Sequence, residues 1–156
     1  ERGIPICYTP GALLGASAPV TLAGALAQTN AEALGSITLH QLKSRGAPMI
    51  SGLTMETLDM RTTHISYGSP ENRLTNSAFA DIYHYYHIPM WSEVGSDAIA
   101  LDEQAGWEWM AGILMAGLDG ANLIHDAGYL GQGLVGNPAS IVMCDEIISY
   151  VRHILG

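Results

Sequence analysis

Residues 88–93 read Ile-Pro-Met-Trp-Ser-Glu, a short apolar run that ends in polar and reactive side chains. Three further runs of this kind lie at Ile4–Tyr8, Pro48–Gly52 and Ala121–Asp126, and the segments between them have helical periodicity. Alternation of strand and helix is typical of a parallel sheet with crossover helices. In such folds the carboxyl ends of the strands carry the chemistry, so function is expected there.

The alternation predicts four strand–helix units. The expected strands are Gly3–Thr9, Pro48–Gly52, Ile88–Trp91 and Ala121–His125. The expected helices span Pro19–Arg45, then 69–86 with Ser69 as N-cap, then Asp102 to about Gly120, and last a helix opened by Asn137 and Pro138. A complete barrel of this type has eight units. We therefore expect an α/β fold that is about half of a TIM (β/α)8 barrel, with residues 1–156 as a single partial barrel domain.

Three loops follow expected strands. Leu53–Glu71 has no clear period apart from a short strand expected at Thr63–Tyr67, and a loop of that length is more often functional than idle. The other two are Glu93–Ala100 and the glycine-rich Gly128–Gly136. All three loops would lie at the end of the sheet where the site is expected.

Composition disfavours several kinds of partner. The 156 residues carry a net charge of −9 and only six Lys and Arg, which disfavours nucleic acid and anionic membrane surfaces. No apolar stretch approaches the roughly 20 residues of a membrane span, and no signal peptide is recognised. We expect a cytoplasmic protein, and a start at Glu1 without Met indicates a piece of a longer chain. Cys7 and Cys144 lack metal-ligand spacing, so two buried free thiols and no metal site are expected.

Five side chains at the strand ends and in their loops could do chemistry: Tyr8, Trp91, Glu93, His125 and Tyr129. Aromatic rings that flank a carboxylate can hold a cation, and quaternary ammonium groups are a known target of such cages. The alternative is that Trp91 and Tyr129 only pack at the barrel rim. A strand-end His such as His125 is structural about as readily as it is catalytic or ligand-binding.

The glycine-rich run Gly131-Gln132-Gly133 precedes a helix and could bind an anion through backbone amides. A phosphate site is nevertheless disfavoured, because no phosphate-binding glycine motif follows a strand and Pro138 removes one amide.

Five stretches, in order along essentially the whole chain, resemble the trimethylamine:corrinoid methyltransferase family. They are Ser17–Ala25 (SAPVTLAGA), Thr29–Glu32 (TNAE), Gly68–Glu71 (GSPE), Asp102–Gly106 (DEQAG) and Gly120–Ile124 (GANLI). Family members are considerably longer. The resemblance implies transfer of a methyl group from a methylated amine to the Co(I) of a corrinoid (cobalamin) that a partner protein carries, with no corrinoid bound directly by this chain.

One departure from the family pattern concerns Gly95. Trimethylamine enzymes of the family carry pyrrolysine in a Gly-Ser-pyrrolysine-Ser-Asp-Ala run, and Glu93–Ala98 here reads Glu-Val-Gly-Ser-Asp-Ala, with Gly95 at the pyrrolysine position. The chain therefore resembles the pyrrolysine-lacking branch, some of whose members demethylate glycine betaine. A quaternary ammonium leaves as a neutral tertiary amine, so it needs positioning and desolvation more than a covalent handle.

The resemblance implies a site at the carboxyl ends of the strands. The residues expected to bind substrate are Tyr8, Trp91, Tyr129, Gly131 and Gln132. The aromatic rings would surround the methylated nitrogen, while His125 or the loop amides would meet a substrate carboxylate. Glu93 would offset the positive charge or touch the corrinoid protein. Gly95 would leave room for a bulkier substrate or for the approach of the cobalt.

Other interpretations stay open. They are a trimethylamine-specific methyltransferase, a lyase or isomerase on the same barrel, and a non-catalytic half barrel that only holds an amine. A half barrel also exposes two sheet edges and an apolar face. We therefore expect self-association, or association with the missing half of the barrel.

Overall fold

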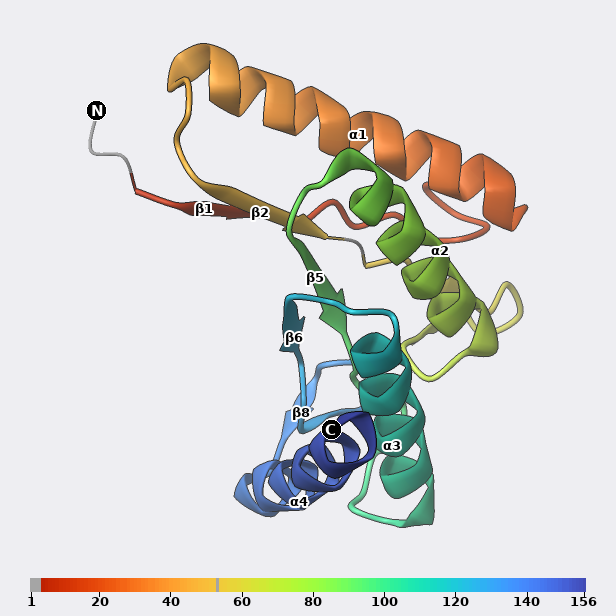
Figure 1. Ribbon diagram of the computed structural model, residues 1–156. Helices are drawn as coiled ribbons and strands as arrows, with labels where there is room; N and C mark the ends of the chain where they lie inside the picture. The colour runs from red at the N-terminus through yellow and green to blue at the C-terminus, as the bar shows by residue number, and fades with distance from the viewer. Residues whose placement is uncertain (1–3, 53) are drawn as a thin grey trace.

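A computed structural model of the chain describes residues 4–52 and 54–156. Within them, four parallel strands form the central sheet, in the order β1-β2-β5-β6. These strands are β1 (Ile6–Tyr8), β2 (Met49–Gly52), β5 (Met90–Glu93) and β6 (Leu123–His125). The α/β class with a parallel sheet is thereby confirmed (Figure 1). Gly3 and Leu53, which open the expected first strand and the long loop, lie outside the described residues.

Four helices in the same residues connect and follow the strands. They are α1 (Leu22–Lys43), α2 (Pro70–Tyr86), α3 (Glu103–Leu118) and α4 (Pro138–Leu155). The side chains of Ser69, Asp102 and Asn137 cap α2, α3 and α4 by accepting a backbone N–H from the first turn. Figure 1 shows α1, α2 and α3 along one side of the sheet, and α4 packs against α3. This arrangement is consistent with part of a barrel.

Two small antiparallel hairpins extend beyond the carboxyl ends of the sheet strands. One pairs β3 (Thr57–Leu58) with β4 (Ile65–Ser66), and the other pairs β7 (Tyr129–Leu130) with β8 (Val135–Gly136). The short strand expected at Thr63–Tyr67 is confirmed by β4, whereas the other three hairpin strands lie where only loops were expected. The hairpins follow β2 and β6, so they flank the end of the sheet where the site was expected.

The helices bury two apolar cores against the sheet. Phe79, Tyr83 and Met90 belong to the core under α1 and α2. Trp109 and Cys144 belong to the core between α3 and α4. Cys144 is a buried free thiol, as expected, and burial raises its pKa to about 11. None of the helices in the described residues is both long and apolar enough to cross a membrane.

The expectation that Cys7 is buried was wrong, because this free thiol is exposed. Met90 packs in the first core, so its register partner Ser51 also faces the helices. Successive residues of a strand point to opposite faces, which turns Ile50 and its partner Cys7 to the face that these helices leave open.

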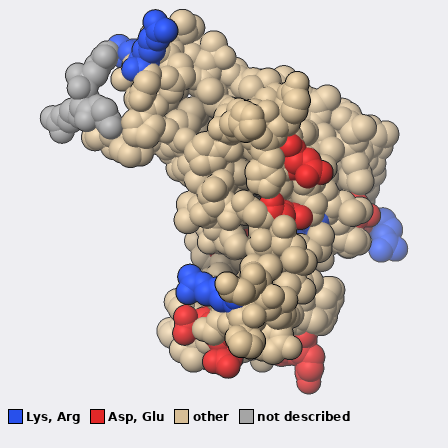
Figure 2. All heavy atoms as spheres, in the orientation of Figure 1, with Lys and Arg blue, Asp and Glu red and all other residues tan. Residues whose placement is uncertain are grey.

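Charged side chains are sparse on the surface. Figure 2 shows them scattered over a mainly uncharged face of the molecule.

Candidate functional site

Trp91, Glu93 and His125 share the open face of the sheet at the carboxyl ends of β5 and β6. Glu93 pairs with His125 in the strand register, and Trp91 lies two residues before Glu93, so all three side chains point the same way. The ring centroids of Trp91 and His125 are 4.5 Å apart. The structure therefore brings together three of the expected site residues.

Trp91 is fixed in place by its neighbours on the sheet. Its side chain is fully buried, and its indole Nε1 donates to the backbone carbonyl of Tyr8 at 3.0 Å. Gly52 lies beneath it, and a Cβ at Gly52 would lie only 2.4 Å from ring atom Cδ2 of Trp91. A residue without a side chain is required at position 52 for this packing.

Tyr8 contributes its backbone to the site and not its ring. It pairs in register with Ser51, whose hydroxyl accepts a hydrogen bond from Tyr83 of α2 at 2.8 Å. The Tyr8 side chain therefore lies on the helix-facing side of the sheet, opposite to Trp91. The role of Tyr8 as an aromatic wall stays a prediction that this register does not favour, because one residue of register decides the face.

Glu93 is fully buried with only one carboxyl oxygen paired. Nδ2 of Asn72 donates to Oε1 at 2.7 Å, and Oε2 has no hydrogen-bond partner within the part of the chain that the structure describes. Burial, and then the charge of Glu56, raises the pKa of Glu93 well above its usual range, against the lowering effect of Asn72 and Arg73. A buried carboxyl oxygen without a partner, together with the raised pKa, makes Glu93 a candidate functional residue.

Two further carboxyl groups, Glu56 and Asp126, lie within electrostatic range of Glu93. Glu56 is buried, and burial raises its pKa, while hydrogen bonds from its own backbone and from Thr54 lower the pKa and the charge of Asp126 raises it. Neighbouring carboxyl groups disfavour one another's ionised form, and a cation placed among them relieves that repulsion. The strand ends therefore form an environment that favours a positively charged ligand.

Asp126 orients the imidazole of His125. Its Oδ1 lies 2.7 Å from Nδ1 of His125, and Nε2 of the same ring is buried without a partner among the described residues. Asp126 has a φ of 65°, a left-handed conformation that residues other than glycine adopt rarely. Strained backbone of this kind clusters at functional sites, because the surrounding structure holds it in place.

The guanidinium of Arg73 clamps the loop after β5 from the helix side. Nη1 donates to the carbonyl of Glu93 at 2.9 Å, and Nη2 donates to the carbonyls of Tyr67 at 2.8 Å and Gly95 at 3.2 Å. Burial lowers the pKa of Arg73, and the nearby carboxyl groups act in the opposite direction. Gly112 of α3 makes room for this group, since a Cβ there would lie 3.0 Å from Cζ.

Glu108 of α3 holds the next part of the same loop. Its Oε2 accepts from the hydroxyl of Ser96 at 2.6 Å and from the backbone N–H of Asp97 at 2.8 Å. Asp97 in turn accepts from the backbone N–H of Tyr67 at 2.7 Å and of Gly68 at 3.1 Å. The loops after β4 and β5 are therefore locked together by charged side chains.

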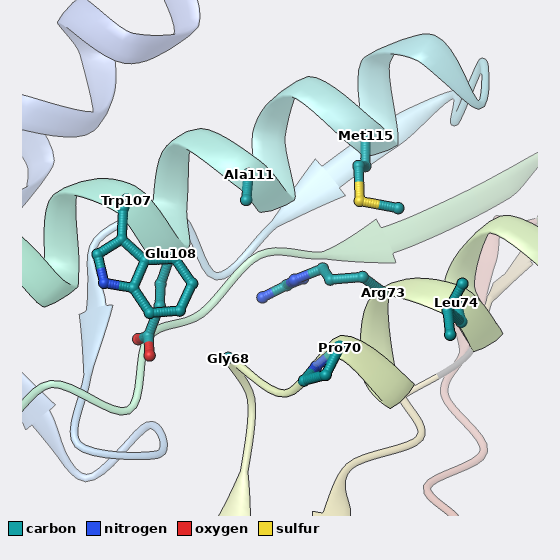
Figure 3. A pocket seen from close by; sticks show the side chains of 8 residues that line it. All are labelled: Gly68, Pro70, Arg73, Leu74, Trp107, Glu108, Ala111 and Met115. Carbon is teal, nitrogen blue, oxygen red and sulfur yellow. The ribbon is translucent and has the colours of Figure 1, made fainter.

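A groove of about 450 Å³ lies between α2 and α3 (Figure 3). Arg73 and Glu108 line it together with Gly68, Pro70, Leu74, Trp107, Ala111 and Met115. Figure 3 shows both charged side chains in the space between the two helices. The groove lies on the helix side of the sheet, so we place the site at the strand ends and assign Arg73 and Glu108 to holding it.

The glycine-rich loop after β6 uses its amides within the protein. The N–H of Gly131 donates to the carbonyl of Ala98 at 2.8 Å, and that of Gln132 donates to the carbonyl of Ser96 at 3.2 Å. These amides hold the loop against residues 96–98, so an amide contact with a substrate carboxylate would need the loop to give up these hydrogen bonds. Substrate binding by Gly131 and Gln132 stays a prediction, which the side chain of Gln132 could fulfil without that change.

Tyr67 and Glu56 belong to the same site, and sequence reasoning missed both. A Cβ at Gly95 would lie 3.3 Å from Cδ1 of Tyr67, and a Cβ at Gly133 would lie 3.5 Å from its hydroxyl and 3.6 Å from Cδ2 of Tyr129. Tyr67 thus lies between Gly95 and the expected site residue Tyr129. The signal for both missed residues was the long aperiodic stretch after β2, whose length alone indicated function.

Comparison with known proteins gives consistent matches. The family model described as trimethylamine methyltransferase (MTTB) matches residues 1–156. A trimethylamine methyltransferase MttB of Desulfitobacterium hafniense is 36% identical over 157 residues, which is 100% of this chain and 32% of that protein. A glycine betaine methyltransferase of the same species, strain Y51, is 36% identical over 98% of this chain and 32% of its own length.

A trimethylamine methyltransferase MttB of Methanosarcina barkeri (strain Fusaro) is 37% identical over 96% of this chain and 30% of its own length. The chain therefore spans about a third of the length of the curated relatives it matches. Relatives with two different substrates in their names match it at the same level of identity, so identity does not choose between them.

Proposed function

The chain belongs to the trimethylamine methyltransferase (MTTB) family, and from this premise we propose that the full-length protein moves a methyl group from an N-methylated amine to a corrinoid protein. Residues 1–156 then form a single partial (β/α) barrel domain, about half of a TIM barrel, and the remaining part of the protein completes it. The corrinoid is the methyl acceptor and arrives on its own carrier protein, so this chain holds no corrinoid itself.

Within that family we propose the pyrrolysine-lacking branch and a quaternary amine of the glycine betaine type as the methyl donor. Gly95 supports this choice, because a glycine offers no side chain that could bond to the amine. The methyl group of a quaternary ammonium needs no further activation for transfer. Its C–N bond breaks with the electron pair going to nitrogen, and the product is a neutral tertiary amine. A trimethylamine-specific enzyme is the second candidate, supported by the equal identity of relatives with that name.

The observation that carries this proposal is the buried Glu93, with Oε2 unpaired, next to the rings of Trp91 and His125. In the complex the ammonium lies among Glu93, Glu56 and Asp126 and against the aromatic rings. Its positive charge favours the ionised form of Glu93, which then gives up its proton and stabilises the cation. The methyl carbon faces the open side of the sheet, where the Co(I) of the corrinoid donates its electron pair to form the new bond.

A substrate carboxylate needs a hydrogen-bond donor at the other end of the molecule. His125 supplies this donor in its imidazolium form: Nδ1–H donates to Asp126 at 2.7 Å, and Nε2, which has no partner among the described residues, then carries a second N–H for the substrate carboxylate. The side chains of Tyr129 and Gln132 complete the wall on the side of the β7–β8 hairpin.

The test is a cobalt assay on the full-length protein. It is combined with a Co(I)-reduced corrinoid protein, and glycine betaine or trimethylamine is added while the absorbance change to methyl-Co(III) is followed. We expect methylation with glycine betaine and none with trimethylamine, because the site stabilises a permanent cation. Methylation only with trimethylamine would move the protein to the second candidate.

The control for this assay is the same mixture with choline, which keeps the quaternary nitrogen and lacks the carboxylate. A slower reaction with choline than with glycine betaine supports the role of His125. No methylation from any N-methyl donor, in a protein that still binds glycine betaine, would contradict methyl transfer and support an amine-binding role.

A further inference from the structure

Tyr67 is held across the strand ends by contacts with two glycines. Its ring packs on Gly95, where a Cβ would approach Cδ1 to 3.3 Å and Cγ to 3.4 Å. Its hydroxyl lies over Gly133, where a Cβ would approach it to 3.5 Å. The side chain therefore reaches from the loop after β5 to the loop that follows β7, and a side chain at position 95 would occupy space that the ring now fills.

The backbone of Tyr67 is pinned from both sides by charged groups. Its N–H donates to Oδ1 of Asp97 at 2.7 Å, and its carbonyl accepts from Nη2 of Arg73 at 2.8 Å. The same Arg73 nitrogen donates to the carbonyl of Gly95 at 3.2 Å. One guanidinium thus fixes Tyr67 and Gly95 relative to each other, so the contact between ring and glycine does not depend on a mobile loop.

The surroundings of the Tyr67 hydroxyl are acidic. Burial raises its pKa, and the charges of Glu93, Glu56 and Asp126 raise it further, followed by Tyr129. The phenol therefore stays neutral and protonated throughout the physiological range. A neutral aromatic ring next to several carboxyl groups is a suitable face for a cation without hydrogen-bond donors, because such a cation is held by the ring and by charge alone.

We propose that Tyr67 determines the specificity of the amine site: its ring, seated on Gly95, forms the wall against which an N-methylated ammonium packs, and it limits the size of the group bound there. This inference rests on the proposed function. It follows from the contact at Gly95, and it extends the site to a residue outside the sheet. A consequence is that a Cβ at position 95 forces the ring of Tyr67 to shift by a few tenths of an ångström.

The test compares two ligands by calorimetry on the full-length protein without corrinoid protein. One is glycine betaine, and the other is its carbon isostere, in which carbon replaces the quaternary nitrogen and removes the positive charge. We expect Tyr67→Leu to weaken binding of glycine betaine by about tenfold and of the isostere by less than about threefold, as loss of a cation–π contact requires. Tyr67→Phe retains the ring and therefore retains the ratio of the two affinities.

A second variant, Gly95→Ala, still tests the proposal if Tyr67→Leu fails to fold. Gly95→Ala places a Cβ against the ring, so in the wild-type background it should weaken binding of glycine betaine more than binding of the isostere; where Tyr67→Leu folds, it should cause no further loss in that background. Equal weakening of both ligands by either single substitution, or additive effects of the two, would overturn the proposal. Tyr85→Leu, on the exposed face of α2, is the matched control and should change neither affinity.

The two proposals fail in different ways. Normal methyl transfer by the wild-type protein, with the ratio of affinities unchanged in Tyr67→Leu, would overturn only the role of Tyr67. A wild-type protein that neither binds glycine betaine nor transfers a methyl group from any N-methyl donor would overturn the proposed function and this inference with it.

Discussion

Glu93 is a buried carboxyl group of the site, and the shift of its pKa predicts how the free energy of unfolding depends on pH. Its pKa lies well above the usual 4.5 because of burial and the nearby Glu56. Above about pH 4.5 the unfolded chain releases this proton while the folded protein keeps it. Stability therefore falls as pH rises toward the folded-state pKa, by up to about 1.4 kcal/mol per pH unit.

The measurement is the urea midpoint of the full-length protein at several pH values between about 5 and 7. The Glu93→Gln variant keeps a side-chain oxygen that can accept the hydrogen bond from Asn72, but this side chain cannot titrate. Its urea midpoint should therefore fall less than that of the wild type as the pH rises over this range. Glu56, whose pKa is also raised, contributes to the slope that remains. Parallel curves for the wild type and Glu93→Gln would contradict a protonated Glu93.

The site residues differ in how far the sequence could predict them. The meeting of Trp91, Glu93 and His125 was predictable, because each lies at or next to the end of a recognisable strand and parallel strands bring their carboxyl ends together. The face on which the Tyr8 ring lies was not predictable, since strand ends are identified only to within a residue or two and each step reverses the face. Glu56 and Tyr67 reach the site from a stretch without a period, and only their contacts with Glu93 and Gly95 reveal them.

The starts of three helices agree closely with what the local sequence predicts. The starts of α2, α3 and α4 agree with their capping residues Ser69, Asp102 and Asn137, since an N-cap is decided within one turn of the chain. Strands β3, β7 and β8 are two residues long, and strands that short form only where tertiary contacts place them together. This difference explains why the sheet and helices were predictable and most of the two hairpins was not.

The contact between Arg73 of α2 and Gly112 of α3 predicts how a substitution at position 112 affects stability. Ala at position 112 would place a Cβ 3.0 Å from Cζ of Arg73 and 3.2 Å from Cβ of Val94, so the guanidinium would have to shift by a few tenths of an ångström and strain its hydrogen bonds to the carbonyls. We expect Gly112→Ala to destabilise the protein by about 1–3 kcal/mol, as overpacking does. The measurement is the urea midpoint of the full-length variant.

The matched control for the clamp is Gly35→Ala in α1, where no atom lies within 4 Å of the new Cβ. There the usual preference of helices for Ala should raise stability by up to about 1 kcal/mol. The two substitutions are chemically identical and should act in opposite directions. A gain in stability at both positions would show that Arg73 has room to move and does not hold the loop.

At the scale of the whole molecule, the described sheet has two edges, β1 and β6, with a neighbour on one side only. Its open face also exposes apolar side chains, among them Leu123, which pairs with Trp91 and is 48% exposed. Unpaired edges beside an exposed apolar face favour association with another chain or with the rest of the barrel. We therefore expect the 156-residue chain, prepared alone, to self-associate.

Sedimentation velocity at several micromolar concentrations measures this association. The isolated chain should show species larger than the monomer whose share grows with concentration, and Leu123→Lys should reduce them by placing a charge on the open face. Leu42→Lys on the outer side of α1, where the side chain is 80% exposed, should change the distribution less. A single monomer peak for the unsubstituted chain would mean that its open face is stable in water, and would contradict the expected self-association.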